Sequence, residues 1–193
     1  MHYLQTIYAI MQRARGLGYR ALDNGTQLIG RVPHAGSQAW LHILFNPVSD
    51  SEIDDLESNI GIRFPEVFRD FLTFANGLSL FCGSLSIYGK RTDCDRTGDS
   101  VWQPFNIVTP NKDERLRDSK PSFLYVGGYP CGNGSYVYIE LKELKVYRCS
   151  RQSSEPLEKW GSFPDMLISE ANRLAGFFDE SGRRLNTRQP VVT

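Results

Sequence analysis

The sequence has few of the side chains that build metal sites and disulfide frameworks, with three histidines and four cysteines in 193 residues. The cysteines (Cys82, Cys94, Cys131 and Cys149) form no C-x-x-C pair, and every histidine precedes them, so the ligand spacing of a zinc site is missing. A chain of this length can bury an adequate core without disulfides, and its first residues carry no export signal. We therefore expect four free thiols, no metal and no cofactor.

An excess of one charge and a long hydrophobic run are also lacking. Lys and Arg together number 22, as do Asp and Glu, which argues against the basic field of a dedicated nucleic-acid-binding protein. The most apolar run, residues 39–45, is too short to span a membrane. Apolar residues 4, 7, 8 and 11 follow helical spacing with no Lys or Arg before them, which favours an amphipathic helix over a signal peptide. These features predict a cytoplasmic protein without a membrane or nucleic-acid partner.

No set of catalytic residues is recognisable. Residues 93–99 read DCDRTGD, which is similar both to the nucleophile motif of haloacid-dehalogenase-like phosphatases and to the start of a calcium loop. A polar segment rather than a buried strand precedes Asp93, and Pro104 occupies the twelfth loop position, where calcium needs a bidentate Glu. His42 lies in an apolar run without an acid or nucleophile spaced to assist it, which favours a strand histidine with a backbone partner. We predict that the protein is not an enzyme.

The clearest local signals are those of helices. Ser49 and Glu52 match a capping box, and apolar residues 53, 56 and 60 follow on one helical face, with Gly61 placed to end the helix. Pro65 suits the first position of a second helix, which the Asn-Gly pair at 76–77 would end. A further helix is expected from Ser162, and an N-terminal helix precedes one or two strands within residues 17–48.

Between these helices, short apolar segments separated by turns predict strands at residues 78–81, 85–88, 123–126, 135–141 and 146–149. Helices followed by consecutive strands and a closing helix predict the α+β class, an antiparallel meander sheet with helices packed on one face and an N-terminal helix plus strand extension. We expect an extension packed on the domain (1–48), an α+β domain (49–178) and a mobile tail (179–193).

Acidic residues gather in two places that could contact a partner. The first is the predicted helix after Ser49, where acids occur without an intervening Lys or Arg, and the second is the polar loop after residue 90. Such a charge run is either an ordinary solvated face or a surface that steers a basic partner. The candidate partner-binding residues are Asp54, Asp55, Glu57, Asp93, Asp95, Asp99 and Trp102.

Two segments together resemble a known family. Residues 53–77 read IDDLESNIGIRFPEVFRDFLTFANG, and residues 123–128 (FLYVGG) and 132–141 (GNGSYVYIEL) supply a glycine turn and a strand. In this order they resemble the SUKH superfamily, which includes fungal cell-wall-synthesis regulators and bacterial toxin-immunity proteins. The resemblance implies a non-enzymatic protein-binding module, most often an immunity protein that neutralises a cognate nuclease toxin. Such a toxin is expected to be cationic because it must grip phosphates. The alternative is a regulatory or scaffolding domain for an endogenous partner.

Overall fold

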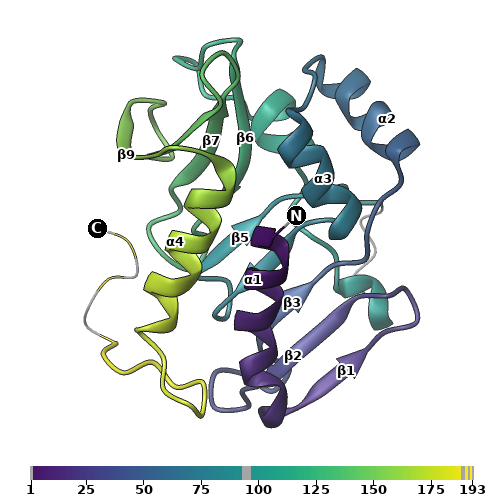
Figure 1. Ribbon diagram of the computed structural model, residues 1–193, viewed down its shortest axis with the longest axis vertical. Helices are drawn as coiled ribbons and strands as arrows, with labels where there is room; N and C mark the ends of the chain where they lie inside the picture. Colours follow the sequence, from purple (N-terminus) through teal and green to yellow (C-terminus); the bar gives the residue numbers. More distant parts are fainter. Residues whose placement is uncertain (1, 93–96, 188–189, 191, 193) are drawn as a thin grey trace.

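The computed structural model describes residues 2–92, 97–187, 190 and 192. Its centre is an antiparallel sheet whose strands lie in the order of the chain, so that every strand pairs with the one before it (Figure 1). The strands in the described residues are β1 (Tyr19–Ala21), β2 (Gln27–Arg31), β3 (Trp40–Leu44), β4 (Leu78–Leu80), β5 (Leu85–Ile87), β6 (Phe123–Gly128), β7 (Tyr136–Glu140), β8 (Lys145–Cys149) and β9 (Pro156–Trp160). This arrangement confirms the predicted α+β class and meander sheet.

Helices cover one face of this sheet. They are α1 (His2–Gln12), α2 (Asp50–Ile60), α3 (Glu66–Phe74) and α4 (Phe163–Ala175). In Figure 1, α1, α3 and α4 lie in front of the sheet, and α2 lies beside α3. The ring of Phe163 packs edge-on against Phe68 at 5.3 Å and Phe71 at 5.4 Å, which joins α4 to α3. Burying each of these rings stabilises the fold by about 1.5–3 kcal/mol.

The predicted helix ends are largely confirmed. The Glu52 amide donates to Ser49 Oγ at 3.4 Å, the Ser49 amide donates to Glu52 Oε2 at 2.9 Å, and Gly61 ends α2 with φ 75°. Pro65 is the residue before α3 rather than its first residue. The Asn-Gly pair at 76–77 does not end the helix as predicted, because α3 stops at Phe74 with Ala75 in an extended conformation as its cap. Gly77 (φ 86°) is required for another reason, since a Cβ there would lie 2.5 Å from the Ile87 carbonyl oxygen. Gly77 therefore permits a close approach to β5.

The first part of the chain continues the same sheet. Three strands, rather than one or two, occupy the described residues between 17 and 48, and β3 pairs with β4 through Ile43 opposite Ser79. Helix α1 is tied to α3 by the Tyr3 hydroxyl, which donates to the Val67 carbonyl at 3.0 Å. Single-turn segments complete the structure: 3₁₀ turns at Arg13–Leu17 and Gly98–Val101, and a π-helical turn at Thr109–Asp113.

The C-terminal segment starts with a hydrogen-bonded turn after α4. Asp179 Oδ1 accepts from the amides of Ser181 and Arg183, and the Leu185 amide donates to the Phe177 carbonyl at 2.9 Å. The mobility expected for residues 179–193 stays a prediction. None of the helices in the described part of the chain is long and apolar enough to cross a membrane.

Candidate functional site

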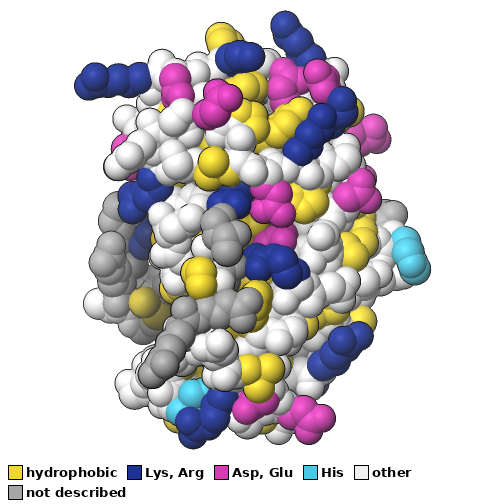
Figure 2. Space-filling view, turned by 90° about the vertical axis from the view of Figure 1, so that its left-hand side faces the viewer, with side chains coloured by type: hydrophobic (Ala, Val, Ile, Leu, Met, Phe, Trp, Pro, Cys, Tyr) yellow, Lys and Arg dark blue, Asp and Glu magenta, His cyan; other side chains and the backbone are white. Residues whose placement is uncertain are grey.

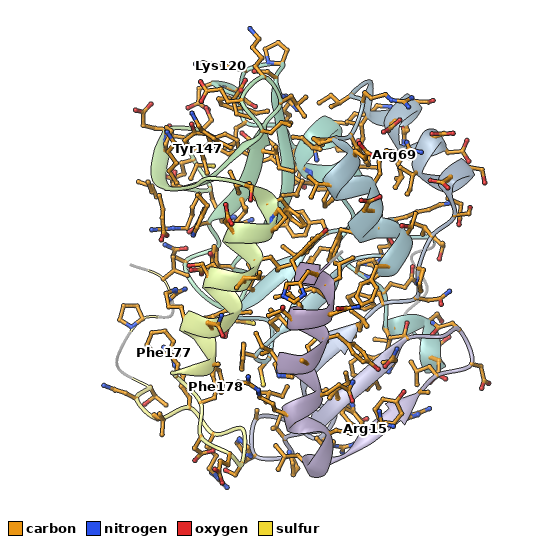
Figure 3. All side chains as sticks on the ribbon, viewed as in Figure 1. Arg15, Arg69, Lys120, Tyr147, Phe177 and Phe178 are labelled. Atoms are coloured by element: carbon orange, nitrogen blue, oxygen red, sulfur yellow. The ribbon has the colours of Figure 1, made fainter. Side chains whose placement is uncertain are left out.

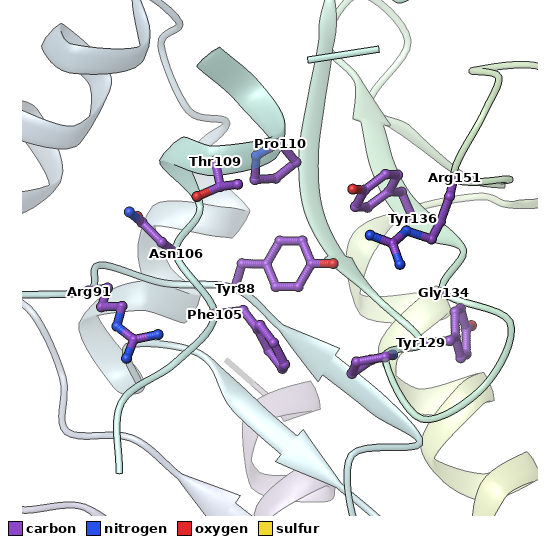
Figure 4. A pocket seen from close by; sticks show the side chains of 11 residues that line it. Tyr88, Arg91, Phe105, Asn106, Thr109, Pro110, Tyr129, Gly134, Tyr136 and Arg151 are labelled. Carbon is purple, nitrogen blue, oxygen red and sulfur yellow. The ribbon is translucent and has the colours of Figure 1, made fainter. Parts of the chain in front are cut away.

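The face of the sheet turned away from α4 carries aromatic side chains and a cavity. Because side chains alternate along a strand, Val137 and Ile139 of β7 enter the helix-covered core, whereas Tyr136 and Tyr138 point to the other face. A cavity of about 470 Å³ opens beside Tyr136. Its described lining residues are Tyr88, Arg91, Phe105, Asn106, Thr109, Pro110, Tyr129, Pro130, Gly134, Tyr136 and Arg151 (Figure 4).

Segments far apart in the sequence build the walls of this cavity. Tyr88 follows β5 directly, and its ring packs edge-on against Phe105 at 5.9 Å. The backbone holds these two segments together, since the Gly89 amide donates to the Phe105 carbonyl at 3.0 Å. The rim formed by the π-helical turn is fixed by Asn111, whose side chain bonds both to the Ile107 carbonyl and to the backbone of Tyr125. The cavity is therefore lined by residues that follow β5, by the 105–110 segment, by the connection between β6 and β7, by β7 and by a residue after β8.

Glycines in the turn between β6 and β7 leave room for two of the lining side chains. A Cβ on Gly128 would lie 2.5 Å from the Tyr88 hydroxyl, and one on Gly134 (φ 74°) would collide with the stem of Arg151. The glycine turn seen in the sequence thus shapes the cavity as well as the connection. Tyr88, Phe105, Tyr136 and Arg151 were not among the predicted site residues. The sequence marks the glycine segment only as a turn, and nothing in its spacing connects that turn with Tyr88 or Phe105.

The cavity combines apolar walls with positive charge and hydroxyl groups. Arg91 and Arg151 lie on opposite sides of the Tyr88 ring (Figure 4). The described lining residues include no Asp, Glu, His, Cys or Lys. Burial raises the pKa of the Tyr88 hydroxyl, and nearby Tyr136 raises it further, whereas Arg151 opposes the shift. Tyr88 therefore stays a neutral phenol, which suits it to hydrogen bonding.

On α2, two of the three predicted acids remain at the surface and one does not. The Asp54 side chain is 59% exposed and pairs with Arg69 Nη1 at 2.9 Å, and Asp55 is exposed. The prediction that Glu57 belongs to a solvated acidic face is wrong, because its side chain is only 7% exposed. Residues four apart share a helical face, so Glu57 lies next to Ile53 on the buried side of α2.

Glu57 is held there by three donors from the adjoining segment and α3. Its Oε1 accepts from the Phe64 amide at 2.8 Å and from Arg69 at 2.9 Å, and Arg63 lies 3.5 Å from Oε2. Figure 3 shows Arg69 where α2 and α3 face each other. The negative charge of α2 is thus partly neutralised by a residue of the neighbouring helix.

The second group of predicted residues lies elsewhere. Asp93 and Asp95 are outside the described residues. Asp99 pairs with Arg20 of β1 at 3.0 Å, and the half-buried Trp102 lines a hollow together with Ile43 of β3. Of the predicted loop residues that the structure describes, Asp99 and Trp102 lie near β1 and β3, whereas Asp54 and Asp55 lie on α2.

The described surface beside β9 and the buried His42 do not suggest a further binding site. On the side that carries β9 and the C-terminal segment, acidic and basic side chains are interspersed outside the grey residues (Figure 2). His42 is buried with its Nδ1 3.4 Å from the Phe81 amide, which confirms the predicted strand histidine with a backbone partner. Within residues 2–92, 97–187, 190 and 192, no group of three or more His, Cys, Asp or Glu side chains is arranged to hold a metal ion.

Comparison with known proteins identifies a family. Residues 47–169 match the family model described as the SMI1 / KNR4 family (SUKH-1). The matched region runs from α2 into α4 and contains every described lining residue of the cavity. No curated protein matches the chain.

Proposed function

Because the chain belongs to the SMI1 / KNR4 family (SUKH-1), we propose that it is a non-enzymatic protein-binding module that neutralises a cognate nuclease toxin. The aromatic cavity on the open face of the sheet carries this proposal. Protein interfaces concentrate their binding energy in pockets formed by Tyr, Trp and Arg, and Tyr88, Tyr136 and Arg151 supply this composition. Since a nuclease attacks the nucleic acids of the cell, we place the protein in the cytoplasm.

The chemistry of the cavity supports binding rather than catalysis. A general base or an activated nucleophile requires a titratable group close to a partner that tunes it. The described lining residues supply arginines, phenols, an amide and a threonine hydroxyl, and burial keeps the Tyr88 phenol neutral. These groups donate hydrogen bonds and pack against an inserted side chain.

A second contact region is proposed on α2. Asp54 and Asp55 are exposed, unlike Glu57, and the toxin is expected to be cationic. Lys112 on the rim of the cavity donates to the Asn59 carbonyl at 2.9 Å, so the end of α2 adjoins that rim. One partner could therefore span both regions. The proposed loop contacts are Asp93, Asp95, Asp99 and Trp102.

The test begins with co-expression of this protein and each toxin encoded beside its gene, scored as rescue of growth. The purified pair is then examined for nuclease inhibition over a range of ratios. A binding module should reach complete inhibition only when one equivalent per toxin has been added. Complete inhibition by a small fraction of an equivalent would indicate an enzyme. Failure to bind any neighbouring toxin would favour the regulatory or scaffolding alternative.

Arginine variants connect the inhibition to the cavity. Arg151→Glu should weaken inhibition strongly because it reverses the charge inside the proposed interface. Arg117→Glu is the matched control, since Arg117 is exposed and does not line the cavity. Equal effects of both variants would remove the cavity from the proposed interface.

A further inference from the structure

The Arg151 guanidinium and the phenols of Tyr88 and Tyr136 line the same cavity, and its described lining residues include no acid. We propose that it recognises a carboxylate side chain of the partner protein, with Arg151 pairing the carboxylate and the hydroxyls of Tyr88 and Tyr136 donating to it. This inference rests on the proposed function and adds the chemistry that the binding surface selects.

The first argument is the state of Arg151. No described residue forms an ion pair or a hydrogen bond with its guanidinium group. Its stem nevertheless packs against Gly134, the position where any larger residue would collide with it. An arginine that is held in place without a partner loses less conformational freedom when a carboxylate arrives. Arg91, on the other side of the cavity, already takes part in other interactions, so Arg151 is the arginine proposed to pair with the carboxylate.

The second argument is the supply of hydrogen-bond donors. The Tyr88 side chain is nearly buried, at 8% exposure, and its hydroxyl points toward the side of the cavity where Tyr136 and Arg151 lie (Figure 4). Within the described part of the chain, neither the Tyr88 nor the Tyr136 hydroxyl bonds to another residue. A carboxylate only accepts hydrogen bonds, so it matches two phenols and a guanidinium. An inserted Lys or Arg side chain would meet like charge from Arg151.

The apolar lining residues further restrict which partner segment fits the cavity. Phe105 and Pro110 both line the cavity, and Phe105 is 52% exposed. An acidic residue with an apolar neighbour on a projecting loop would bury that neighbour against Phe105 while its carboxylate reaches Arg151. One unpaired arginine balances one negative charge, which favours a carboxylate over a doubly charged phosphate. A cationic toxin can present such a loop, because a positive net charge does not exclude individual Asp or Glu residues.

The recognition can be tested without knowing the toxin. The probes are two capped tetrapeptides, acetyl-Gly-Phe-Glu-Gly-amide and the same peptide with Gln in place of Glu, followed by NMR of the protein with labelled Tyr rings and Arg Nε groups. The Glu peptide should shift Tyr88, Tyr136 and Arg151 with millimolar affinity that falls with salt, and the Gln peptide should bind about tenfold more weakly. Arg151→Gln should abolish this difference, and Arg117→Gln should retain it.

Several results would overturn the proposal. Equal binding of the two peptides to the wild type, a preference for the Glu peptide that persists in Arg151→Gln, or no saturable shift at the cavity would each reject carboxylate recognition. Inorganic phosphate that competes more strongly than the Glu peptide would reassign the cavity to phosphate groups. The two proposals can fail independently. Loss of toxin rescue with retained binding of the Glu peptide would reject the proposed function alone, and retained rescue without peptide binding would reject carboxylate recognition alone.

Discussion

Nη1 of Arg69 lies 2.9 Å from Oε1 of Glu57, which joins α3 to α2 through an ion pair on the buried side of both helices. The same carboxylate oxygen accepts the Phe64 amide, so one acid fixes both the helix pair and its connecting segment. The hydrogen bond that Arg69 donates to Glu57, with a second one to Asp54, also raises the pKa of Arg69. A residue that the sequence placed on a binding surface therefore has a structural role.

Removing Arg69 should destabilise the fold. Arg69→Met leaves the buried carboxylate of Glu57 with only the exposed Arg63 as a cation, which should cost about 3 kcal/mol of unfolding free energy in urea denaturation. Glu57→Gln should cost less, because its amide oxygen still accepts from Phe64. Asp55→Asn, an exposed change on the same helix, is the control and should leave the unfolding free energy unchanged. Loss of equal stability in all three variants would contradict a specific role for the pair.

A second buried acid depends on a tyrosine. The Tyr129 hydroxyl donates to Glu170 Oε2 at 2.6 Å, and Glu170 is only 1% exposed. Tyr129→Phe removes one of the donors that solvate this carboxylate and should destabilise the protein by about 1–3 kcal/mol. Tyr147→Phe is the matched control, because the Tyr147 hydroxyl bonds to no other described residue. Similar unfolding curves for the two variants would show that the bond contributes little.

Acidification should weaken the fold through His42. Burial lowers the pKa of its imidazole from 6.5 to about 3, so below pH 6.5 the unfolded chain takes up a proton that the native state refuses. This contribution is complete above pH 6.5 and is lost as the pH falls toward 3, by up to about 1.4 kcal/mol per pH unit.

Urea unfolding between pH 7.5 and 5.5 isolates this effect, because the carboxylates stay ionised there. His42→Gln should flatten the dependence on pH over this range, whereas His34→Gln, at an exposed position, should retain it. A profile that is the same in the wild type and His42→Gln would mean that another group carries the dependence.

Thiol reactivity should follow burial. Burial raises the pKa of Cys149 to about 12 and of Cys82 to about 11, and Cys131, which is exposed, should react first because the thiolate is the nucleophile. Mass spectrometry after timed alkylation should show Cys131 modified before Cys82, and Cys149 modified only on unfolding. Denatured, unreduced protein should yield all four thiols, including Cys94, which lies outside the described residues. Recovery of fewer would indicate a disulfide.

The exposed acids of α2 should speed the encounter with a cationic toxin. The double variant Asp54→Lys, Asp55→Lys leaves Glu57 intact, so it should fold yet associate more slowly, with the largest difference at low salt. The control pair Glu155→Lys and Glu180→Lys changes the net charge equally at exposed positions away from α2. Stopped-flow association that slows equally in both variants would attribute the effect to net charge.

The local features of this fold could be predicted because neighbouring residues determine them. The capping box of Ser49 and Glu52, the left-handed Gly61 and the alternation along residues 135–141 depend on hydrogen bonds and spacing within a few positions. The meander followed from the tendency of consecutive strands to pair, which holds here even across the long connections 45–77 and 88–122. The spacing of apolar residues in α2 predicted wrongly that Glu57 is exposed. An acid beside an apolar helix face is exposed or buried according to what packs against it.

The sequence by itself determined the class, the order of the strands and the family. Only the tertiary structure decided that Arg69 reaches Glu57 and that Tyr88, Phe105, Tyr136 and Arg151 meet around one cavity. These residues come from segments joined by the sheet and by the Gly89–Phe105 backbone bond, and no spacing rule connects them. The glycine turn was visible as a turn, but its second role became apparent once Tyr88 and Arg151 were seen to occupy the space that a Cβ would fill.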